Sequence, residues 1–558
     1  MSLILGIDTG GTFTDIVVWD SAQNRVLQKA KAFTTPHDLA IGIKNCMDAL
    51  DLTACRSLSA VHLSTTLMVN AILEDRPPKI GILLIGTHLS KKLPVAVKYE
   101  LTRYRYHDSH KRFSANPATS RHLIQLFDEA CPQVLVSACG TNYQDLKKSA
   151  TIYLKSLLRS EIVCCSHIAA NSDFYQRTLN AVTAIGAIPL ITKWTASITS
   201  VIRKHGIYAP IRILTNTGSL VSPDQAIADP LSTIMSGPAA SFIGSRCLTK
   251  EKDYLLLDMG GTSLDITRVI ERNTRFRTID TPVGNYAFHI KALDLQCFGT
   301  GGDSQIKLNS MGDIVVGPAK AVPLCVLGSQ YPHLASELDK YRLPEGYDLC
   351  TATETDCFFL HQDVSHVTLA NDEREILQLL SEGAHSLFFL ANYFGVDADF
   401  LHLDRLLKKG YVGRACLTPT DILHAEGSFN RWDSQTSTVG LSLLASRKGC
   451  APAEFIKEVK TFITNQLSFF CMQSIASFEE ESFRFSDSQA TMYLIEKYLH
   501  DRHGFVTSDF SIQKPIIGLG APAKAWLPAV AKKLHAQLSL PEDGDVACAI
   551  GAAAGREE

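Results

Sequence analysis

The sequence of 558 residues has no marked excess of charge, because 54 Lys and Arg side chains balance 57 Asp and Glu side chains. The formal charge of −3 provides no general attraction for nucleic acid or for an anionic membrane. Only 20% of the residues are charged and 46% are hydrophobic, which is ordinary for a folded protein and excludes global disorder. At roughly 150 residues per domain, this length predicts about three or four domains.

Long hydrophobic runs are also missing. The apolar runs at residues 80–85 and 255–257 have the length of strands and fall short of the ~20 residues of a membrane-spanning helix. No basic segment precedes the first apolar stretch, and Asp8 follows almost at once, which is unlike a secretory signal. We therefore expect a cytoplasmic protein.

The 15 cysteines form no Cys-x-x-Cys pair, and an odd, scattered set of this kind predicts reduced thiols, mostly in the core. Two catalytic patterns are absent as well. No Gly-x-Ser-x-Gly segment indicates a serine-hydrolase elbow, and no His-x-x-x-His segment indicates a zinc-binding helix.

One nine-residue segment occurs twice. Residues 8–16 read DTGGTFTDI, and residues 258–266, at an offset of 250, read DMGGTSLDI. Each copy follows an apolar run and precedes a second strand-like stretch. Both copies therefore predict a β-hairpin with a Gly-Gly-Thr turn.

The two turns have the composition of a phosphate-binding site. Adjacent glycines allow the backbone to approach an anion closely and to present N–H groups to it, and the threonine hydroxyl adds another donor. A single hairpin of this kind is commonly just a tight turn, but two copies favour a shared function. The predicted nucleotide-binding residues are Gly10, Gly11, Thr12, Gly260, Gly261 and Thr262.

Each hairpin also carries two acidic residues. Asp8 and Asp258 end the first strands, where a carboxylate can hold a hydrated Mg²⁺ that bridges the β- and γ-phosphates of ATP. Asp15 and Asp265 lie seven residues further on. The sequence leaves two roles open for this second pair, namely a catalytic carboxylate that faces the nucleotide or a local cap of the hairpin.

The duplicated hairpins resemble those of the superfamily of actin, the sugar kinases and the heat-shock ATPases. The resemblance implies an α/β, two-lobed actin-like (ribonuclease H-like) ATPase fold with duplicated phosphate-binding β-hairpins and ATP in the cleft. Residues 515–523 predict a strand that enters a Gly-rich turn before a helix. In this superfamily such a turn lies against the adenosine, which makes Gly518, Gly520 and Ala521 candidates, although an ordinary strand-to-helix turn has the same pattern.

An ordered series of segments resembles the hydantoinase A/5-oxoprolinase family. These segments are residues 5–17, 33–36, 62–66, 69–74, 216–220, 230–244, 258–266, 298–304, 316–318 and 417–421. The resemblance implies an ATP-dependent hydrolase subunit that uses Mg²⁺ and opens a cyclic amide such as 5-oxoproline or a hydantoin by phosphorylating the carbonyl oxygen. It also implies a hydantoinase B-type partner subunit and an oligomer.

Two alternatives remain open. One is an acetone-carboxylase-like ATP-dependent subunit or a small-molecule kinase, and the other is a non-catalytic, ATP-driven switch. Gly299, Gly301 and Gly302 lie in another Gly-rich turn and are also predicted to bind the nucleotide, but this turn departs from the usual family pattern at Thr300 and Asp303. Asp303 would place a negative charge where a phosphate is expected, which indicates either a different substrate or a remodelled part of the site.

Three further residues are candidates for substrate contact: His62, Asn70 and Ser236. Each also has an ordinary structural interpretation. A histidine at a strand end is often simply hydrogen-bonded, and Asn70 and Glu74 have the spacing of an amphipathic helix. Ser236 lies in a turn that opens a helix, and the N-terminus of this helix is what would favour contact with an anionic nucleotide or substrate.

The expected organisation has three parts. Residues 1–190 form the N-terminal lobe with the first hairpin. Residues 191–325 and 411–558 form the nucleotide-binding lobe, and residues 326–410 form an inserted, mostly helical segment.

Overall fold

The computed structural model describes most of the chain in fourteen stretches. These are residues 3–35, 39–51, 58–65, 80–86, 99–105, 117–127, 133–138, 143–158, 161–164, 174–283, 286–342, 353–361, 370–500 and 508–557. Contacts between Cα atoms divide the chain into two compact units. Unit 1 comprises residues 1–247, 275–293 and 548–558, and unit 2 comprises residues 248–274 and 294–547.

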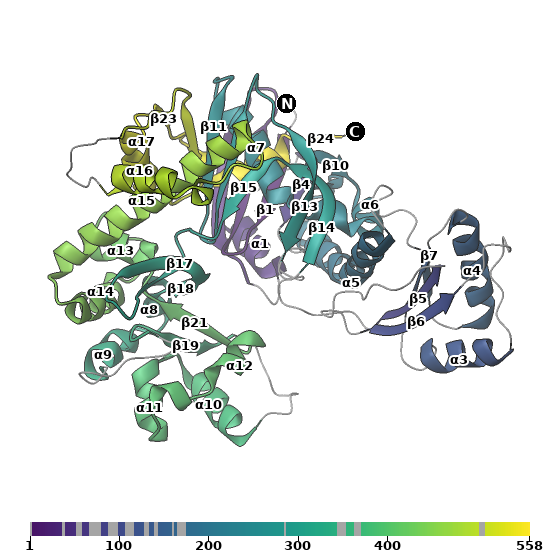
Figure 1. Cartoon of the computed structure of the whole chain (residues 1–558), viewed down its shortest axis with the longest axis horizontal. Coiled ribbons are helices and arrows are strands. Elements are labelled where there is room, and N and C mark those ends of the chain that lie inside the picture. Colours follow the sequence, from purple (N-terminus) through teal and green to yellow (C-terminus); the bar gives the residue numbers. More distant parts are fainter. Residues whose placement is uncertain are drawn as a thin grey trace. The chain divides into compact units, whose positions relative to one another are not determined.

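Unit 1 is built on a seven-stranded sheet with the order β24-β10-β9-β4-β1-β2-β3 (Figure 1). β1 pairs antiparallel with β2 and parallel with β4, which in turn pairs parallel with β9. The strands are β1 (Leu3–Thr9), β2 (Phe13–Asp20), β3 (Arg25–Phe33), β4 (Leu58–Thr65), β9 (Ile211–Leu214), β10 (Ser219–Val221) and β24 (Arg556–Glu557).

Alternation along these strands gives the sheet two different faces. Leu5, Ile7 and Ile16 are fully buried in a core that also contains residues of α1 (Leu39–Asp48) and α5 (Phe174–Lys204). The opposite face carries Gly6, where an added Cβ would lie 2.2 Å from the carbonyl oxygen of Ala549 in α18 (Ala547–Ala553). The absence of a side chain at Gly6 therefore lets α18 pack closely on this face.

Unit 1 also contains a smaller parallel sheet with the order β6-β5-β7-β8 and a β-hairpin, β13-β14. These strands are β5 (Ile80–Gly86), β6 (Tyr99–Arg105), β7 (Gln133–Ala138), β8 (Glu161–Cys164), β13 (Phe276–Val283) and β14 (Tyr286–Leu293). The other helices of the unit are α3 (Pro117–Phe127), α4 (Tyr143–Leu157), α6 (Pro223–Ala228), η2 (Pro230–Thr233) and α7 (Ser236–Leu248).

Unit 2 repeats the topology of the first central sheet. Its five-stranded sheet has the order β15-β12-β11-β22-β23, in which β11 pairs antiparallel with β12 and parallel with β22. The strands are β11 (Tyr254–Met259), β12 (Leu264–Val269), β15 (Leu295–Phe298), β22 (Ile516–Leu519) and β23 (Leu538–Ser539). Because β11-β12-β15 corresponds to β1-β2-β3 and β22-β23 corresponds to β4-β9, the duplication extends beyond the nine-residue segments to both sheets.

Two smaller sheets complete the strands of unit 2, with the orders β16-β17 and β18-β21-β19-β20. Their strands are β16 (Ser304–Leu308), β17 (Ile314–Lys320), β18 (Val322–Pro323), β19 (Cys357–Leu360), β20 (His385–Ser386) and β21 (Val412–Cys416). The helices are α8 (Leu324–Gln330), α9 (His333–Lys340), α10 (Asn371–Glu382), α11 (Leu387–Phe394), η3 (Ala398–Phe400), α12 (Leu403–Lys408), α13 (Pro419–Glu426), α14 (Ser434–Lys448), α15 (Pro452–Glu479), η4 (Phe485–Asp487), α16 (Gln489–Leu499), α17 (Ala523–Lys533) and η5 (Gly544–Val546).

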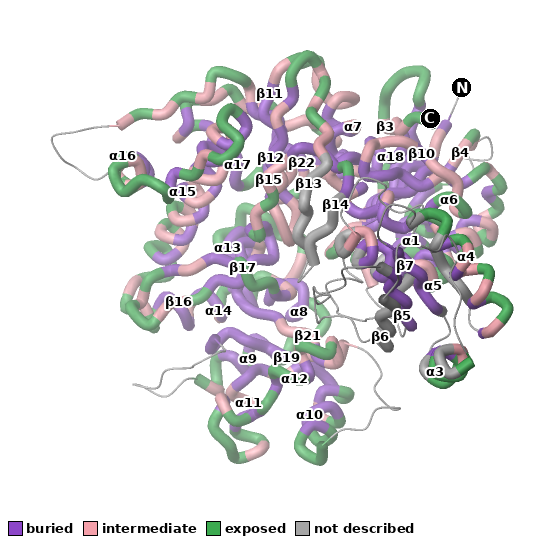
Figure 2. Tube along the Cα trace, turned by 45° about the vertical axis from the view of Figure 1, so that its right-hand side comes forward, coloured by how far each residue is buried: buried purple, intermediate pink, exposed green. Residues whose placement is uncertain are grey.

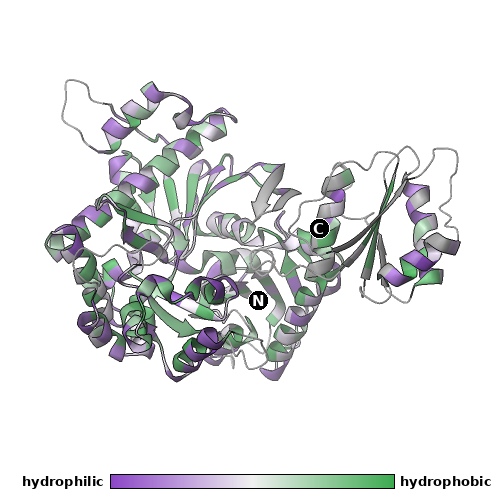
Figure 3. Ribbon diagram, turned by 60° about the horizontal axis from the view of Figure 1, so that its bottom comes forward, coloured by the Kyte–Doolittle hydropathy of each residue, from purple (hydrophilic) through white to green (hydrophobic). Residues whose placement is uncertain are grey.

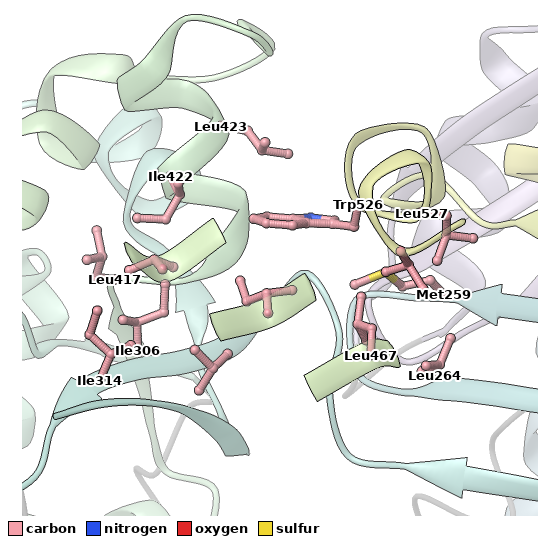
Figure 4. Packing of buried hydrophobic residues seen from close by; sticks show 14 of the residues in the cluster. Met259, Leu264, Ile306, Ile314, Leu417, Ile422, Leu423, Leu467, Trp526 and Leu527 are labelled. Atoms are coloured by element: carbon pink, nitrogen blue, oxygen red, sulfur yellow. The ribbon is translucent and has the colours of Figure 1, made fainter. Parts of the chain in front are cut away.

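A large apolar core supports the second hairpin. Figure 4 shows Met259 and Leu264 from the hairpin close to Leu467 of α15 and Leu527 of α17, and all four are buried. The strands of the central sheets are mostly buried, whereas α16 carries many exposed residues (Figure 2). Figure 3 shows that many helices carry both hydrophilic and hydrophobic residues. The sequence of α10, with buried Ile376, Leu377 and Leu380 among charged residues, is an example. Side chains of α15 and α17 therefore pack against the second hairpin and hold its backbone in place.

The contacts divide the chain at other points than the sequence analysis expected. The expected boundary at 190/191 falls inside α5, a continuous helix whose residues Trp194, Ile198 and Ile202 are buried in the core of unit 1. Residues 326–410 are rich in helix in their described parts, as expected, but they also contain β19 and β20 and cluster with unit 2.

One helix was not singled out as apolar by the sequence analysis. Residues Asn180–Lys204 of α5 have the length and hydropathy of a membrane-spanning helix, by these two criteria alone. Its buried side chains pack against Ile43 and Met47 of α1 and against strands of the central sheet. This packing is typical of the core helix of a globular unit.

Candidate functional site

The turn of the first hairpin is held by its carbonyl groups. The Gly10 amide donates to the Phe13 carbonyl at 2.9 Å, which closes the turn. The amide of Thr34, just after β3, donates to the Thr12 carbonyl at 2.9 Å, and its hydroxyl donates to the Gly10 carbonyl at 2.9 Å. The amide of Gly11, an exposed residue, makes no hydrogen bond among the residues that the structure describes. This N–H group is therefore available to an anion.

The second turn is built in the same way. The Gly260 amide donates to the Ser263 carbonyl at 2.9 Å. The carbonyl groups of Gly260 and Gly261 accept from the amides of Gly302 at 3.1 Å and Asp303 at 2.7 Å. Within the described part of the chain, the amides of Gly261 and Thr262 make no hydrogen bond. Both turns thus use their carbonyl oxygens for support and leave N–H groups as donors, as the phosphate-binding hypothesis requires.

The acidic residues of each hairpin lie in one row across the sheet. In unit 1, Asp8 is directly opposite Asp15 on β2 and Ser64 on β4, and Asp15 is opposite Lys31 on β3. In unit 2, Asp258 is opposite Asp265 on β12 and Leu519 on β22, and Asp265 is opposite Cys297 on β15. Because directly opposite residues project on the same side of a sheet, each pair of carboxylates shares one face.

In the row of unit 1, one of the two carboxylates is paired with a lysine. The Nζ atom of Lys31 lies 2.6 Å from Oδ1 of Asp15, and this ammonium also lies 5.2 Å from the centre of the Phe13 ring. The Ser64 hydroxyl donates to Oδ1 of Asp8 at 2.5 Å. Asp15 therefore has a local structural partner, whereas Asp8 has one carboxylate oxygen fixed by a neutral donor.

The corresponding row of unit 2 has a thiol in place of the lysine. Burial raises the pKa of Asp265 to about 7, with a smaller contribution from the Asp258 carboxylate, and a hydrogen bond from the Cys297 thiol opposes these effects. The Oδ1 atom of Asp265 is shielded from solvent and has no hydrogen-bond partner among the described residues. Lys320, whose own pKa is lowered by burial, is the cation whose charge acts on Asp265. The Asp258–Asp265 pair can therefore hold a proton near neutral pH.

The donor set of both rows fits Mg²⁺. Carboxylate and hydroxyl oxygens are the ligands that this ion prefers, and it usually takes one or two carboxylates together with phosphate oxygens and water. Asp8 and Asp258 are the residues that would hold it, because each ends the strand that leads into a turn with available amides.

The Gly-rich turn at 299–303 supports the second hairpin. The amides of Gly302 and Asp303 donate to carbonyl groups of this hairpin. The Gly301 amide is also occupied, because it donates to the Ser304 hydroxyl at 2.9 Å. An added Cβ at Gly301 would lie 2.4 Å from the Gly261 carbonyl oxygen. The structure thus places Gly301 and Gly302 in a support of the second hairpin, in which close backbone approach requires glycine. Gly299 begins the same turn, where a Cβ would make only an ordinary contact of 3.4 Å with Pro318.

The predicted strand and helix near the C-terminus are confirmed as β22 and α17. Gly518 is buried within β22, where a Cβ would lie 2.6 Å from both Leu527 and Leu540, so this position needs glycine for packing. Gly520 has φ = +87°, and a Cβ there would lie 2.0 Å from the Met259 carbonyl oxygen. The turn therefore lies against the end of β11, next to Asp258, with Ala521 exposed beside it.

The three candidates for substrate contact have different outcomes. The Nδ1 atom of buried His62 lies 3.1 Å and 3.0 Å from the carbonyl oxygens of Ala552 and Ala553, and burial lowers its pKa. The Ser236 hydroxyl donates to the Thr65 carbonyl at 2.9 Å and is fully buried. Both groups thus connect β4 to a helix, and Asn70 lies outside the described residues.

Several residues of the site could not be singled out from the sequence. Thr34, Ser64, Lys31 and Cys297 reach the hairpins from other strands, and only the strand order brings them there. Thr420, at the start of α13, donates its amide at 3.1 Å and its hydroxyl at 2.8 Å to the Gly302 carbonyl. The segment at 417–421, noted only for its resemblance, is thus a second layer of support for the hairpin of unit 2.

Comparison with known proteins agrees with this geometry. The model of the hydantoinase/oxoprolinase N-terminal region matches residues 4–105, and the hydantoinase/oxoprolinase model matches residues 178–325. The chain is 26% identical over 356 residues to the caprolactamase subunit alpha of Pseudomonas jessenii, covering 57% of this chain and 50% of that protein. It is 23% identical over 368 residues to the acetophenone carboxylase gamma subunit of Aromatoleum aromaticum, covering 57% and 49%.

A solved structure extends the likeness to the whole fold. The nucleotide-free structure of acetone carboxylase superposes with a TM-score of 0.63 at 15% identity, over 99% of this chain and 70% of that one. The superposition and the duplicated hairpins define an actin-like ATPase-type fold. The chain resembles the hydantoinase/oxoprolinase family over residues 4–105 and 178–325, and it spans about half the length of the curated relatives that it matches.

Proposed function

We propose that this chain binds Mg-ATP through the hairpins β1-β2 and β11-β12 and acts as the ATP-dependent subunit of an enzyme that opens a cyclic amide. The observation that carries the proposal is the repetition, in both units, of an acidic residue at the strand end followed by a turn whose carbonyls are held and whose amides are available. A merely structural hairpin has no need of this arrangement twice.

Each group of the hairpins has a defined part in this proposal. The amides of Gly11, Gly261 and Thr262 donate to phosphate oxygens, and the positive N-terminal end of α7, which Ser236 fixes to the end of β4, adds to the field in unit 1. Asp8 and Asp258 hold Mg²⁺, which when bound neutralises charge on the β- and γ-phosphates. Asp265 holds or releases a proton beside Asp258.

The chemistry follows from the low reactivity of an amide. Transfer of the γ-phosphoryl group to the carbonyl oxygen forms a new O–P bond, breaks the bond to the β-phosphate and releases ADP. The phosphorylated oxygen is then a good leaving group. Water adds to the carbon and the C–N bond of the ring breaks, which leaves an amine and an acyl phosphate. A second water then releases the phosphate and leaves a carboxylate, so that the energy of ATP drives ring opening.

The match to a caprolactamase subunit supports a lactam, a hydantoin or 5-oxoproline as the class of substrate. The matches to acetophenone and acetone carboxylases support a second candidate, in which the same ATP site activates a ketone or bicarbonate for carboxylation. These two candidates differ in whether bicarbonate is required.

We also propose a partner subunit. Both curated relatives are named as subunits of larger enzymes, and this chain spans only about half of each. A hydantoinase B-type protein is the partner that the family resemblance implies.

The test is ADP release by the purified chain with Mg-ATP, alone and with a B-type partner from the same genome. The acceptors are caprolactam, 5-oxoproline, hydantoin, acetophenone with and without bicarbonate, and none. Stimulation by a cyclic amide without bicarbonate, with an amino acid as product, supports the hydrolase. Stimulation only with ketone and bicarbonate supports the carboxylase. ATP binding with no acceptor response, even with the partner, favours the non-catalytic switch.

A further inference from the structure

A second cluster of chemically active side chains lies in unit 2, in a segment that the proposed ATP site does not use. His333 and Glu337 are one helical turn apart on α9, and His385 is in β20. The Nε2 atom of His333, Oε1 of Glu337 and Nδ1 of His385 all lie within 4.8 Å of one another. The distances from Glu337 Oε1 are 2.7 Å to His385 Nδ1 and 3.7 Å to His333 Nε2.

We propose that His333, Glu337 and His385 form a binding site for a divalent transition cation of the zinc class. Two imidazole nitrogens and one carboxylate oxygen are ligands that suit Zn²⁺ and its neighbours, whereas Mg²⁺ and Ca²⁺ prefer sites made of oxygen alone. Ligand atoms about 2.1 Å from one ion in tetrahedral geometry are about 3.4 Å apart. The two distances from Glu337 lie on either side of this value, and the two histidine nitrogens lie within 4.8 Å of each other. No distance in the cluster therefore has to change by more than about 1.4 Å to reach metal-binding geometry.

The protein fixes the ligands in place before any ion is bound. The second oxygen of Glu337, Oε2, accepts from the Ser386 amide at 2.9 Å, which leaves Oε1 for the histidines. The His385 ring stacks on Phe389, with ring centres 4.3 Å apart. Support of this kind around the ligands is typical of metal sites, in which it sets the orientation of each ligand.

The charge of the cluster also calls for a cation. Glu337 is buried, and a buried carboxylate needs a positive partner. Among the described residues, the ion pairs of Glu337 are with His333 and His385 alone, and these rings carry charge only when protonated. A divalent cation supplies the charge when both imidazoles are neutral.

The site is open to solvent on one side. The His333 side chain is 44% exposed, and its Nε2 atom lies 2.8 Å from the carbonyl oxygen of Ala384. On binding, His333 exchanges this hydrogen bond for the metal bond and carries its proton on Nδ1, while His385 carries its proton on Nε2. Water or the Ala384 carbonyl completes the coordination, and the ion joins α9 to the start of α11.

The experiment measures Zn²⁺ binding by the full-length chain without a histidine tag, after treatment with a chelator and dialysis. Competition with a chromophoric chelator gives the affinity, and the visible absorption of added Co²⁺ reports coordination by nitrogen ligands. Wild type is expected to bind one more Zn²⁺ than H333N or E337Q, or to bind it at least about tenfold more tightly. Mg²⁺ at the same concentration should not compete.

Two matched controls separate this site from general histidine binding. His205 and His535 each pair with an aspartate, and neither belongs to a cluster of three metal-binding side chains among the described residues. H205N and H535N should therefore bind Zn²⁺ like wild type. H333N changes an exposed side chain, and E337Q keeps an acceptor for the Ser386 amide, so both variants should fold. Bound Zn²⁺ should raise the melting temperature of wild type and not of H333N. Equal stoichiometry, affinity and Co²⁺ spectra in wild type, H333N and E337Q would overturn the proposal.

Discussion

The different neighbours of Asp15 and Asp265 predict opposite effects for the same substitution at equivalent positions. Asp265 has a pKa of about 7 in the folded chain and an ordinary value of 3.8 when unfolded. The folded chain therefore binds this proton more tightly, and the stability of unit 2 should fall as the pH rises from about 4 to about 7. Each pH unit in this window corresponds to about 1.4 kcal/mol, so the loss has an upper limit of about 4 kcal/mol.

The substitution Asp265→Asn removes this loss. The amide is neutral at all pH values and can donate to the Asp258 carboxylate opposite it. At pH 8, D265N should be more stable than wild type by up to about 4 kcal/mol, whereas below pH 4 the two should be about equal. D15N is the matched control in unit 1. It leaves the largely buried ammonium of Lys31 without its partner and should lower stability by about 3 kcal/mol.

Buried cysteines provide a separate readout for each unit. Cys471 lies in the core of unit 2 and Cys46 in the core of unit 1. Labelling of each thiol along a urea series, scaled to the unfolded chain at the same pH, gives the stability of its unit. The reasoning is refuted if D265N is no more stable than wild type above pH 7, or if D15N and D265N shift stability in the same direction.

Three further predictions concern the supports of the hairpins. The substitution Ser64→Ala removes the hydroxyl that donates to Asp8 and should lower Mg-ATP turnover by about tenfold, because hydrogen bonds to charged groups contribute about 1.5–3 kcal/mol. Kinetic assays test this prediction. T65S, which keeps a hydroxyl at the neighbouring position, is the control. Gly301→Ala should displace the second hairpin and lower the melting temperature, because the added Cβ would lie 2.4 Å from the Gly261 carbonyl oxygen. Gly299→Ala in the same turn should be tolerated. Similar melting curves for the two variants would contradict this prediction. Burial lowers the pKa of His62 below 6.5, so the unfolded chain takes up a proton at this ring more readily than the folded chain. Unit 1 should therefore lose stability as the pH falls below 6.5. In H62Q, the stability measured by Cys46 labelling should not show this loss at low pH.

The repeated nine-residue segment made the fold predictable, because it indicates both a local β-hairpin and the duplication of this hairpin. Adjacent glycines after an apolar strand require a turn, and the same pattern 250 residues later predicts the same strand pairing. The structure confirms both hairpins, and in each the two acidic residues are directly opposite.

The neighbours of the acidic residues could not be predicted in the same way. Lys31 and Cys297 occupy equivalent places in the two rows, but they lie on third strands whose registers are set by the whole sheet. The Gly-rich turn at 299–303 has the composition of an anion site, and only its hydrogen bonds show that its amides are used on the hairpin. Composition gives the donors that a segment has, whereas topology decides which of them are already used.

The central claim, that both hairpins bind the phosphates of ATP, is tested most directly by the affinity for Mg-ATP of wild type, D8N and D258N, measured by calorimetry at one pH. The account predicts that either substitution weakens binding by at least about tenfold, while D48N, an exposed aspartate of α1 paired with Lys44 and His205, binds like wild type. Unchanged affinity in both D8N and D258N would contradict the account.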